Sequence, residues 1–334
     1  MKRWLQVWGA ALPALLVAVF LHLTPALAQA PAGGPVNPTA NAANEEQLLQ
    51  GLKRLDGRVS IPDGKAKILE QPQGREWRAF REQYLPWIGG VAVIGMLLAL
   101  AVVYMIFGSI GDHDETSPEK IKRFNWFERF THWMTAFTFI ILSISGLNYI
   151  FGKRLLQPLI GPDAFTVWSQ WAKYAHNFLS MPFMLGILSM FVLWVRDNLP
   201  DRTDVEWIKG GGGLFHHVEA GRFNAGQKAV FWMVAGGGLL MSATGIALMF
   251  PFSVTDINGM QVAQGAHALI GVLFIAAMIA HIYIGTLGMK GAYDAMGSGE
   301  VSLAWAKAHH NLWVEEEQAR NASGPQMPRP APAE

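Results

Sequence analysis

The 334-residue chain contains no cysteine. This absence excludes disulfide bonds, thiolate nucleophiles, zinc–thiolate sites, covalent CxxCH haem attachment and cysteine-ligated iron–sulfur clusters. Charged residues make up only 15% of the sequence, whereas 51% of residues are hydrophobic, which is unlike an ordinary soluble domain. The formal net charge is +1 and there is no Lys/Arg-rich run, so nucleic-acid binding has no electrostatic basis. Chemistry in this protein must use histidine, carboxylates or a cofactor on another chain.

The N-terminal segment is typical of an export signal. Two basic residues precede the apolar stretch 10–23, and Ala26-Leu27-Ala28 presents the small residues that signal peptidase reads. We expect residues 1–28 to be a signal peptide cleaved after Ala28, with a retained anchor helix as the alternative. Residues 29–84 are polar and then charged, which favours a periplasmic tail or a small partner-binding module.

Long apolar runs begin after this tail, and each is close to the roughly 20 residues that cross a bilayer as a helix. Backbone polar groups at membrane depth require helix in each of them. The sequence therefore predicts an all-α membrane protein. Residues 85–108 form an extra N-terminal transmembrane helix, 109–127 a loop, 128–288 a four-helix bundle and 289–334 a C-terminal tail. The five predicted spans are 85–108, 128–150, 171–195, 228–250 and 263–288.

Basic residues in the short loops predict the orientation, because positively charged loops stay in the cytoplasm. The loops after the first and third spans contain eight basic residues, whereas the opposite loops contain two, Lys153 and Arg154. We therefore expect a bacterial inner-membrane protein with a periplasmic mature N-terminus and a cytoplasmic C-terminus. The eight residues are Lys120, Lys122, Arg123, Arg196, Arg202, Lys209, Arg222 and Lys228.

Six of the ten histidines lie outside the mature spans, among charged or glycine-rich neighbours. Exposed loop histidines are usually solvated, and we assign these six no role. They are His22, His113, His216, His217, His309 and His310.

The other four histidines lie inside apolar helices. Glu128, Arg129 and Lys173 are at helix ends, where charged groups can reach the membrane surface, and deeper positions of the last four spans contain no Asp, Glu, Lys or Arg. Intramembrane ionisable groups are costly and mark functional sites, although a single one could simply hydrogen-bond a neighbouring helix. The four are His132, His176, His267 and His281.

Spacing and depth sort these histidines into two pairs. His267 and His281 are fourteen residues apart, so they project from nearly the same helix face about 21 Å apart along the axis. His132 lies near the start of a span that runs from the cytoplasmic side to the periplasmic side. His176 lies near the start of a span that runs in the opposite direction. The predicted pairs are His176 with His267 on the periplasmic side and His132 with His281 on the cytoplasmic side.

Two stacked bis-histidine pairs suit two six-coordinate b-type haems better than zinc, which prefers a tetrahedron of four ligands. Glycines near the ligands would make room for a macrocycle, although small residues also allow close helix packing. A haem-free transporter that relays protons and a purely structural anchor are the alternatives from other functional classes. These glycines are Gly146, Gly245, Gly271, Gly285 and the run Gly236-Gly237-Gly238.

Several motifs together resemble the gamma subunit of membrane-bound respiratory formate dehydrogenase, a dihaem cytochrome b556. They are the run Arg129-Phe130-Thr131-His132-Trp133, His176, the loop 222–228 (RFNAGQK), and His267 with His281. The resemblance covers roughly residues 120–312. The familiar short form has four membrane helices and no cleaved signal, so the N-terminal segments of this chain are additional.

The resemblance implies a non-catalytic subunit that carries electrons. A periplasmic molybdenum- or tungsten-pterin alpha subunit would oxidise formate, and an iron–sulfur beta subunit would pass electrons through the two haems to quinone. By resemblance, the quinone site would involve Asn224, Gly226, Gln227 and His281; the simpler interpretation of 224–228 is a helix N-cap. A cytochrome b subunit of a hydrogenase or another molybdenum oxidoreductase is the nearest alternative.

Overall fold

The computed structural model describes residues 74–111, 118–212 and 218–323. The predicted signal peptide, most of the predicted N-terminal tail and His22, His113, His216 and His217 lie outside these ranges.

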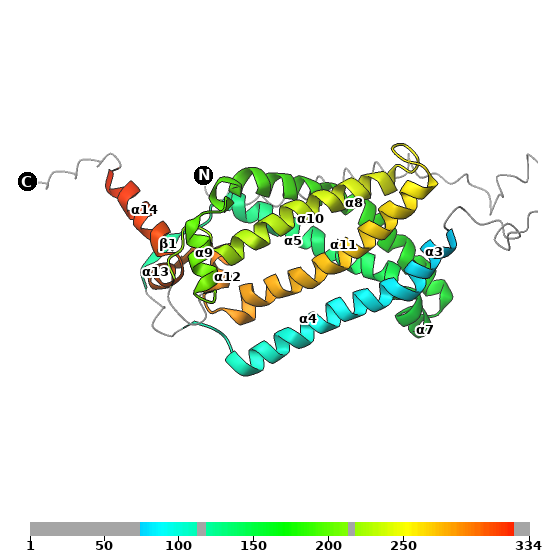
Figure 1. Ribbon diagram of the computed structural model, residues 1–334, viewed down its shortest axis with the longest axis horizontal. Helices are drawn as coiled ribbons and strands as arrows, with labels where there is room; N and C mark the ends of the chain where they lie inside the picture. Colours follow the sequence, from blue (N-terminus) through cyan, green and yellow to red (C-terminus); the bar gives the residue numbers. More distant parts are fainter. Residues whose placement is uncertain (1–73, 112–117, 213–217, 324–334) are drawn as a thin grey trace, which may run out of the picture. The chain divides into compact units, whose positions relative to one another are not determined.

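Five long helices run alongside one another (Figure 1), and each is long and apolar enough to cross a membrane. Their positions agree with the five predicted spans. The third starts earlier than predicted because Pro162, which suits the first turn of a helix, begins it. The helices are α4 (Leu85–Phe107), α5 (Trp126–Leu147), α8 (Pro162–Trp194), α10 (Ala225–Met249) and α11 (Ile257–Tyr283).

Short elements gather at the two ends of these helices (Figure 1). One end, called the α7 end below, has α3 (Gly74–Ala79), η2 (Phe80–Tyr84), η4 (Asn148–Gly152), α6 (Lys153–Leu155) and α7 (Gln157–Ile160). The other, the α13 end, has β1 (Lys120–Lys122), η5 (Arg196–Asn198), α9 (Arg202–Lys209), η6 (Ile284–Gly288), α12 (Ala292–Gly297), β2 (Glu300–Ser302), α13 (Leu303–His309) and α14 (Asn311–Ser323). Strands β1 and β2 pair antiparallel, with Ile121 opposite Val301.

Small residues bring the long helices close together. A Cβ atom on Gly186 of α8 would overlap the hydroxyl of Thr135 of α5, and one on Gly238 of α10 would lie 2.9 Å from Ile187 Cδ1. The extra helix α4 packs on α11, where a Cβ on Gly89 would lie 3.3 Å from Val272. Such close approach is how membrane helices associate, because lipid offers no hydrophobic drive between them.

The outer faces of the helices are apolar. On α4, Val91, Leu98 and Met105 are 68%, 62% and 75% exposed, and they recur at seven-residue spacing on one face of the helix. A soluble protein rarely exposes a continuous apolar face of this kind. The exposed face is consistent with an integral membrane protein.

The C-terminal segment, which the sequence predicts to be a tail from residue 289, is folded up to residue 323. Trp305, Trp313 and Val314 are buried and join the same hydrophobic core as Phe124, which precedes α5. The pairing of β1 with β2 brings this segment to the start of the bundle. Burial of the two indole rings explains why this segment is folded, because large aromatic side chains contribute strongly to packing.

His310 is buried, whereas the sequence predicts a solvated loop residue; that prediction is wrong. It is 1% exposed. Its Nδ1 lies 2.9 Å from the carbonyl oxygen of Gly221 and its Nε2 lies 3.0 Å from Arg123 Nη2. The pattern missed this burial because its partners come from segments far away in the chain.

Glu128 differs from expectation as well, because it is buried at 5% exposure. It closes the capping box of α5 with Asn125 and accepts hydrogen bonds from Trp194 Nε1 and Arg222 Nη2 at 2.9 and 2.7 Å. Arg222 also pairs with Asp197. These contacts compensate the carboxylate for its burial and fix α5 to the loop before α10.

A second ion pair joins α9 to α10. Lys228 Nζ lies 2.7 Å from Asp201 and 3.0 Å from Asp204. Burial opposes ionisation of Asp201, but the hydrogen bonds from Lys228 and Thr203 lower its pKa to about 2. The pair therefore stays charged at neutral pH.

Candidate functional site

Two pairs of histidines face each other between the long helices. His176 of α8 and His267 of α11 have ring centres 6.1 Å apart, with planes inclined by 65°. His132 of α5 and His281 of α11 have ring centres 6.2 Å apart, with planes inclined by 62°. These are the two pairs that spacing and depth predict, and α11 contributes one ring to each.

The ring separations fit one metal ion between two imidazoles. With roughly 2 Å from nitrogen to metal and about 1 Å from nitrogen to ring centre, opposed imidazoles need centres about 6 Å apart. Across the described ranges, no group of three or more His, Cys, Asp or Glu side chains could hold a metal ion, so a structural zinc site does not fit. Two facing histidines would suit a haem iron, because the macrocycle would supply the other nitrogen ligands.

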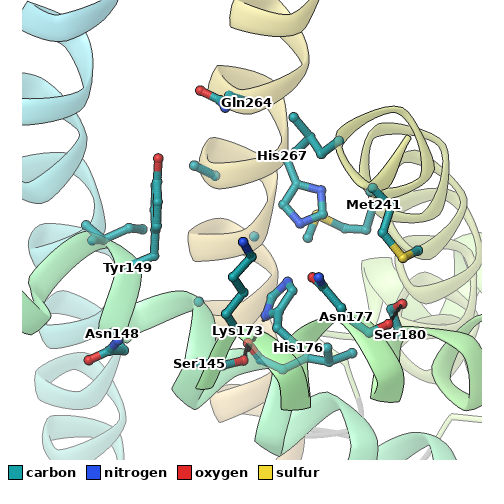
Figure 2. Close-up of a pocket in the computed structure, with 18 of the residues that line it drawn as sticks. Ser145, Asn148, Tyr149, Lys173, His176, Asn177, Ser180, Met241, Gln264 and His267 are labelled. Atoms are coloured by element: carbon teal, nitrogen blue, oxygen red, sulfur yellow. Dashed lines mark hydrogen bonds between the residues drawn. The ribbon is translucent and has the colours of Figure 1, made fainter. Parts of the chain in front are cut away.

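The His176–His267 pair lines a cavity of about 1230 Å³, above the roughly 300–1,000 Å³ of most small-molecule pockets. Figure 2 shows both rings pointing into it from α8 and α11, with Met241 of α10 on one side. Lys173 extends into the same space, and Lys153 also lines it. The cavity thus combines two imidazoles, an apolar interior and two cationic side chains.

Glycines shape the space beside these rings. A Cβ on Gly245 would lie 3.4 Å from His267 Cε1, and one on Gly146 would lie 3.8 Å from His176 Cε1. Both of these glycines, and Gly271, line the cavity. Gly238, by contrast, packs tightly on Ile187. Gly146 and Gly245 therefore leave room beside the histidine rings, whereas Gly238 allows close packing of two helices.

Each ring of the His176–His267 pair has a hydroxyl partner. Ser145 Oγ lies 2.7 Å from His176 Nδ1, and Thr244 Oγ1 lies 2.8 Å from His267 Nδ1. Ser145 also donates to the carbonyl oxygens of Ile141 and Leu142. Each hydroxyl has a single proton. If it donates that proton to a helix carbonyl, it accepts the Nδ1 proton of the imidazole, and this is the tautomer that leaves Nε2 free to bind a metal.

These hydroxyls are functional candidates that the sequence analysis did not identify. Ser145 immediately precedes Gly146, and Thr244 immediately precedes Gly245. A hydroxyl residue followed by glycine, on each of two helices that flank a histidine helix, is the signal that could have found them.

The His132–His281 pair has different surroundings. His132 Nδ1 is buried with no hydrogen-bond partner in the described part of the chain. The indole of Trp133 lies edge-on to His132, with ring centres 5.3 Å apart, and a Cβ on Gly285 would meet nothing within 4 Å. The position of Gly285, one turn after His281, is therefore open, whereas the hydroxyl partners of the other pair are not repeated at His132 among the described residues.

Aromatic rings lie between the two histidine pairs. Phe274 is seven residues after His267 and seven before His281, so it is about 10 Å along α11 from each. Its ring centre is 5.1 Å from that of Phe139, which is also packed against Phe183. Phe274 and Phe183 are buried. The two candidate sites are thus separated by a short layer of packed aromatic rings.

The first segment of the described chain also reaches the cavity. Trp77 of α3 lines it, and the guanidinium of Arg81 lies 4.7 Å from the centre of the Trp77 ring. The sequence predicts that this segment belongs to the N-terminal tail, but Trp77 contributes to the cavity lining.

Asn224 and Gln227, two of the predicted quinone residues, form the predicted helix N-cap at the start of α10. The side-chain Oδ1 of Asn224 accepts a hydrogen bond from the backbone N–H of Gln227 at 3.0 Å, and the side-chain Oε1 of Gln227 accepts one from the backbone N–H of Asn224 at 3.1 Å. A Cβ on Gly226 would lie 3.0 Å from the indole of Trp207. The capping box satisfies the exposed amides at the start of α10, and both side-chain oxygens are used in it.

Comparison with known proteins identifies the family. Residues 123–299 match the family model of the prokaryotic cytochrome b561. The chain belongs to this family. It is therefore a membrane cytochrome b, and cytochromes b carry b-type haem.

Formate dehydrogenase subunits are among the relatives of this cytochrome b. It is 32% identical to the formate dehydrogenase cytochrome b556(fdo) subunit of Escherichia coli (strain K12) over 204 residues, which cover 59% of this chain and 93% of that protein. It is 28% identical to the nitrate-inducible cytochrome b556(Fdn) subunit of the same strain, over 59% of this chain and 91% of that protein. The formate dehydrogenase cytochrome b556 subunit of Haemophilus influenzae is 25% identical, over 57% and 80%. The family match leaves α3 and α4 outside it.

Proposed function

We propose that this cytochrome b is the membrane-anchoring subunit of a formate dehydrogenase and passes electrons from a periplasmic iron–sulfur subunit through two b-type haems to quinone. The observation that carries the proposal is the pair of bis-histidine arrangements, with ring centres 6.1 and 6.2 Å apart, in a chain similar to formate dehydrogenase cytochrome b556 subunits. The catalytic alpha subunit and the iron–sulfur beta subunit would be its partners.

The histidines would hold the two irons. His176 and His267 would bind one on the periplasmic side, and His132 and His281 the other on the cytoplasmic side. The haems would supply one-electron carriers at two depths of the membrane. Because two imidazoles would bind each iron, the irons would be suited to carrying electrons and not to binding oxygen or substrate.

Other residues would orient these groups. The ammonium groups of Lys153 and Lys173 line the His176–His267 cavity and would pair with haem propionates, since charge-assisted hydrogen bonds are strong in a site of low dielectric constant. Phe139 and Phe274 pack together between the two sites and would help to exclude water there. The positive-inside distribution of basic loops supports a cytoplasmic α13 end.

For quinone, we keep the set Asn224, Gly226, Gln227 and His281. The capping box uses the two side-chain oxygens of Asn224 and Gln227, so their amide nitrogens would be the groups that hydrogen-bond a quinone carbonyl. This would place quinone reduction on the cytoplasmic side, beside the His132–His281 site.

Two measurements test the proposal. A reduced-minus-oxidised spectrum of the purified full-length chain should show b-type bands, and His176→Ala or His267→Ala should each lose one of two haems. A chain that stays colourless with haem available would support the haem-free transporter instead. Electron transfer that survives substitution of the histidines would support the structural anchor.

The identity of the partner needs the intact complex. When the complex is purified from membranes through this chain, formate should reduce quinone. Reduction by hydrogen in place of formate would show that the partner is a hydrogenase and would overturn that part of the proposal.

A further inference from the structure

We infer that Ser145 and Thr244 are positioning residues that lower the reduction potential of the iron held by His176 and His267, and so favour electron transfer toward the His132–His281 site. This inference rests on the proposed function, because it requires both haems. It concerns residues that bind neither iron nor substrate.

The first step is the direction of the hydrogen bonds. Thr244 Oγ1 lies 2.7 Å from the carbonyl oxygen of Leu240 and 2.8 Å from His267 Nδ1. Ser145 Oγ lies 2.9 Å from the carbonyl oxygen of Ile141 and 2.7 Å from His176 Nδ1. When Nε2 of each ring binds iron, Nδ1 carries the ring proton, so each hydroxyl accepts from the imidazole and is left to donate its own proton to its carbonyl.

The second step is the effect on the ligand. A hydrogen bond from the free N–H of a metal-bound imidazole fixes its tautomer and orientation and raises its basicity. A hydroxyl that itself donates onward is polarised and becomes a better acceptor. A more basic imidazole stabilises ferric iron more than ferrous iron, so both hydroxyls act to lower the potential.

The third step is the asymmetry between the two sites. His132 Nδ1 is buried and has no partner among the described residues, so this ring lacks the polarising contact that both rings of the other pair have. The difference favours one direction of transfer. In this transfer one electron would pass from the iron held by His176 and His267 to the iron held by His132 and His281, with no bond formed or broken and no proton moved.

The experiment is a redox titration of the purified full-length chain, followed through the b-type absorption bands. Ser145→Ala and Thr244→Val remove a hydroxyl with little change of volume. We expect each to raise the potential of the haem that is lost in His176→Ala, by up to tenfold in its one-electron equilibrium constant, or 59 mV, and to leave the other haem unchanged.

Two further variants make the result specific. Thr244→Ser restores a hydroxyl and should keep the parent potential. Thr138→Val is the matched control, because Thr138 is a buried helical threonine that, like Thr244, donates to backbone carbonyls, those of Met134 and Thr135. It should shift neither haem.

The outcomes separate this inference from the proposed function. Two haems with potentials that do not change in Ser145→Ala and Thr244→Val, or that fall, would overturn the inference and leave the proposed function intact. A parent chain without haem would refute both. If Ser145→Ala fails to retain the haem, the comparison of Thr244→Val with Thr244→Ser still decides.

Discussion

Arg123 and His310 are 187 residues apart in the sequence, yet Arg123 Nη2 lies 3.0 Å from His310 Nε2. Because His310 Nδ1 donates to the Gly221 carbonyl, Nε2 must be the unprotonated acceptor. The rings of Trp305 and Trp313 lie 5.7 and 5.1 Å from the Arg123 guanidinium. This buried contact joins the loop before α5 to the C-terminal helices, and it requires a neutral imidazole.

The Arg123–His310 contact predicts that the protein loses stability in mild acid. Burial and the charge of Arg123 lower the pKa of His310 well below its usual value, while burial and Arg222 lower the pKa of Arg123 to about 9, so Arg123 remains charged. The unfolded chain therefore binds a proton first as the pH falls. The contribution of His310 is complete above about pH 6.5 and decreases below it by about 1.4 kcal/mol per pH unit.

Thermal unfolding of the detergent-solubilised chain between pH 8 and pH 5 checks this prediction. His310→Gln keeps a donor and an acceptor but cannot be protonated, so its melting temperature should depend less on pH than that of the parent. Equal pH dependence in the two proteins would contradict the assignment.

The position of Gly245 predicts that a larger side chain there will reduce haem binding. Gly245→Leu would place a side chain beside His267 Cε1, where even a Cβ would lie 3.4 Å away, and would fill space in the cavity. We expect the haem content of the purified chain to fall by about half, because only this site is affected. Gly236→Ala on the same helix is the control, since a Cβ there meets nothing within 4 Å; it should retain both haems.

The His132–His281 site should be separable from the other site. In the intact complex, His132→Ala or His281→Ala should abolish formate-dependent quinone reduction. The haem held by His176 and His267 should still be reduced by formate, because its ligands are unchanged. Spectra taken after addition of formate, with and without quinone, measure both effects. Wild-type quinone reduction in either variant would show that this site is not needed.

Helix contact between α5 and α8 depends on Gly186. In Gly186→Ala the new methyl group would overlap the Thr135 hydroxyl, so the Thr135 side chain or the two helices must shift, at a cost of about 1–3 kcal/mol. The melting temperature should fall, and Thr135→Ala in the same chain should restore part of it. Gly90→Ala, where a Cβ meets nothing within 4 Å, should leave it unchanged. An equal change in Gly90→Ala would refute the contact as the cause.

Much of the bundle was predictable because a bilayer restricts the possibilities. Each apolar run had to be a helix, and the fourteen residues between His267 and His281 placed both rings on one face of α11. Depth alone then selected their partners, His176 and His132. Helical periodicity and membrane thickness are local properties, so they can be read directly from the order of residues.

The tertiary structure decided what depends on contact between distant segments. Ser145 meets His176 across 31 residues and Thr244 meets His267 across 23, and these contacts depend on how closely and at which rotation neighbouring helices pack. The burial of His310 depends on β1 and β2 bringing the C-terminal helices to the start of α5. Residue order alone determined the helices and the depth of each imidazole. The packing of side chains decided which hydroxyl lies against which ring, because a hydrogen bond forms only over a few ångströms.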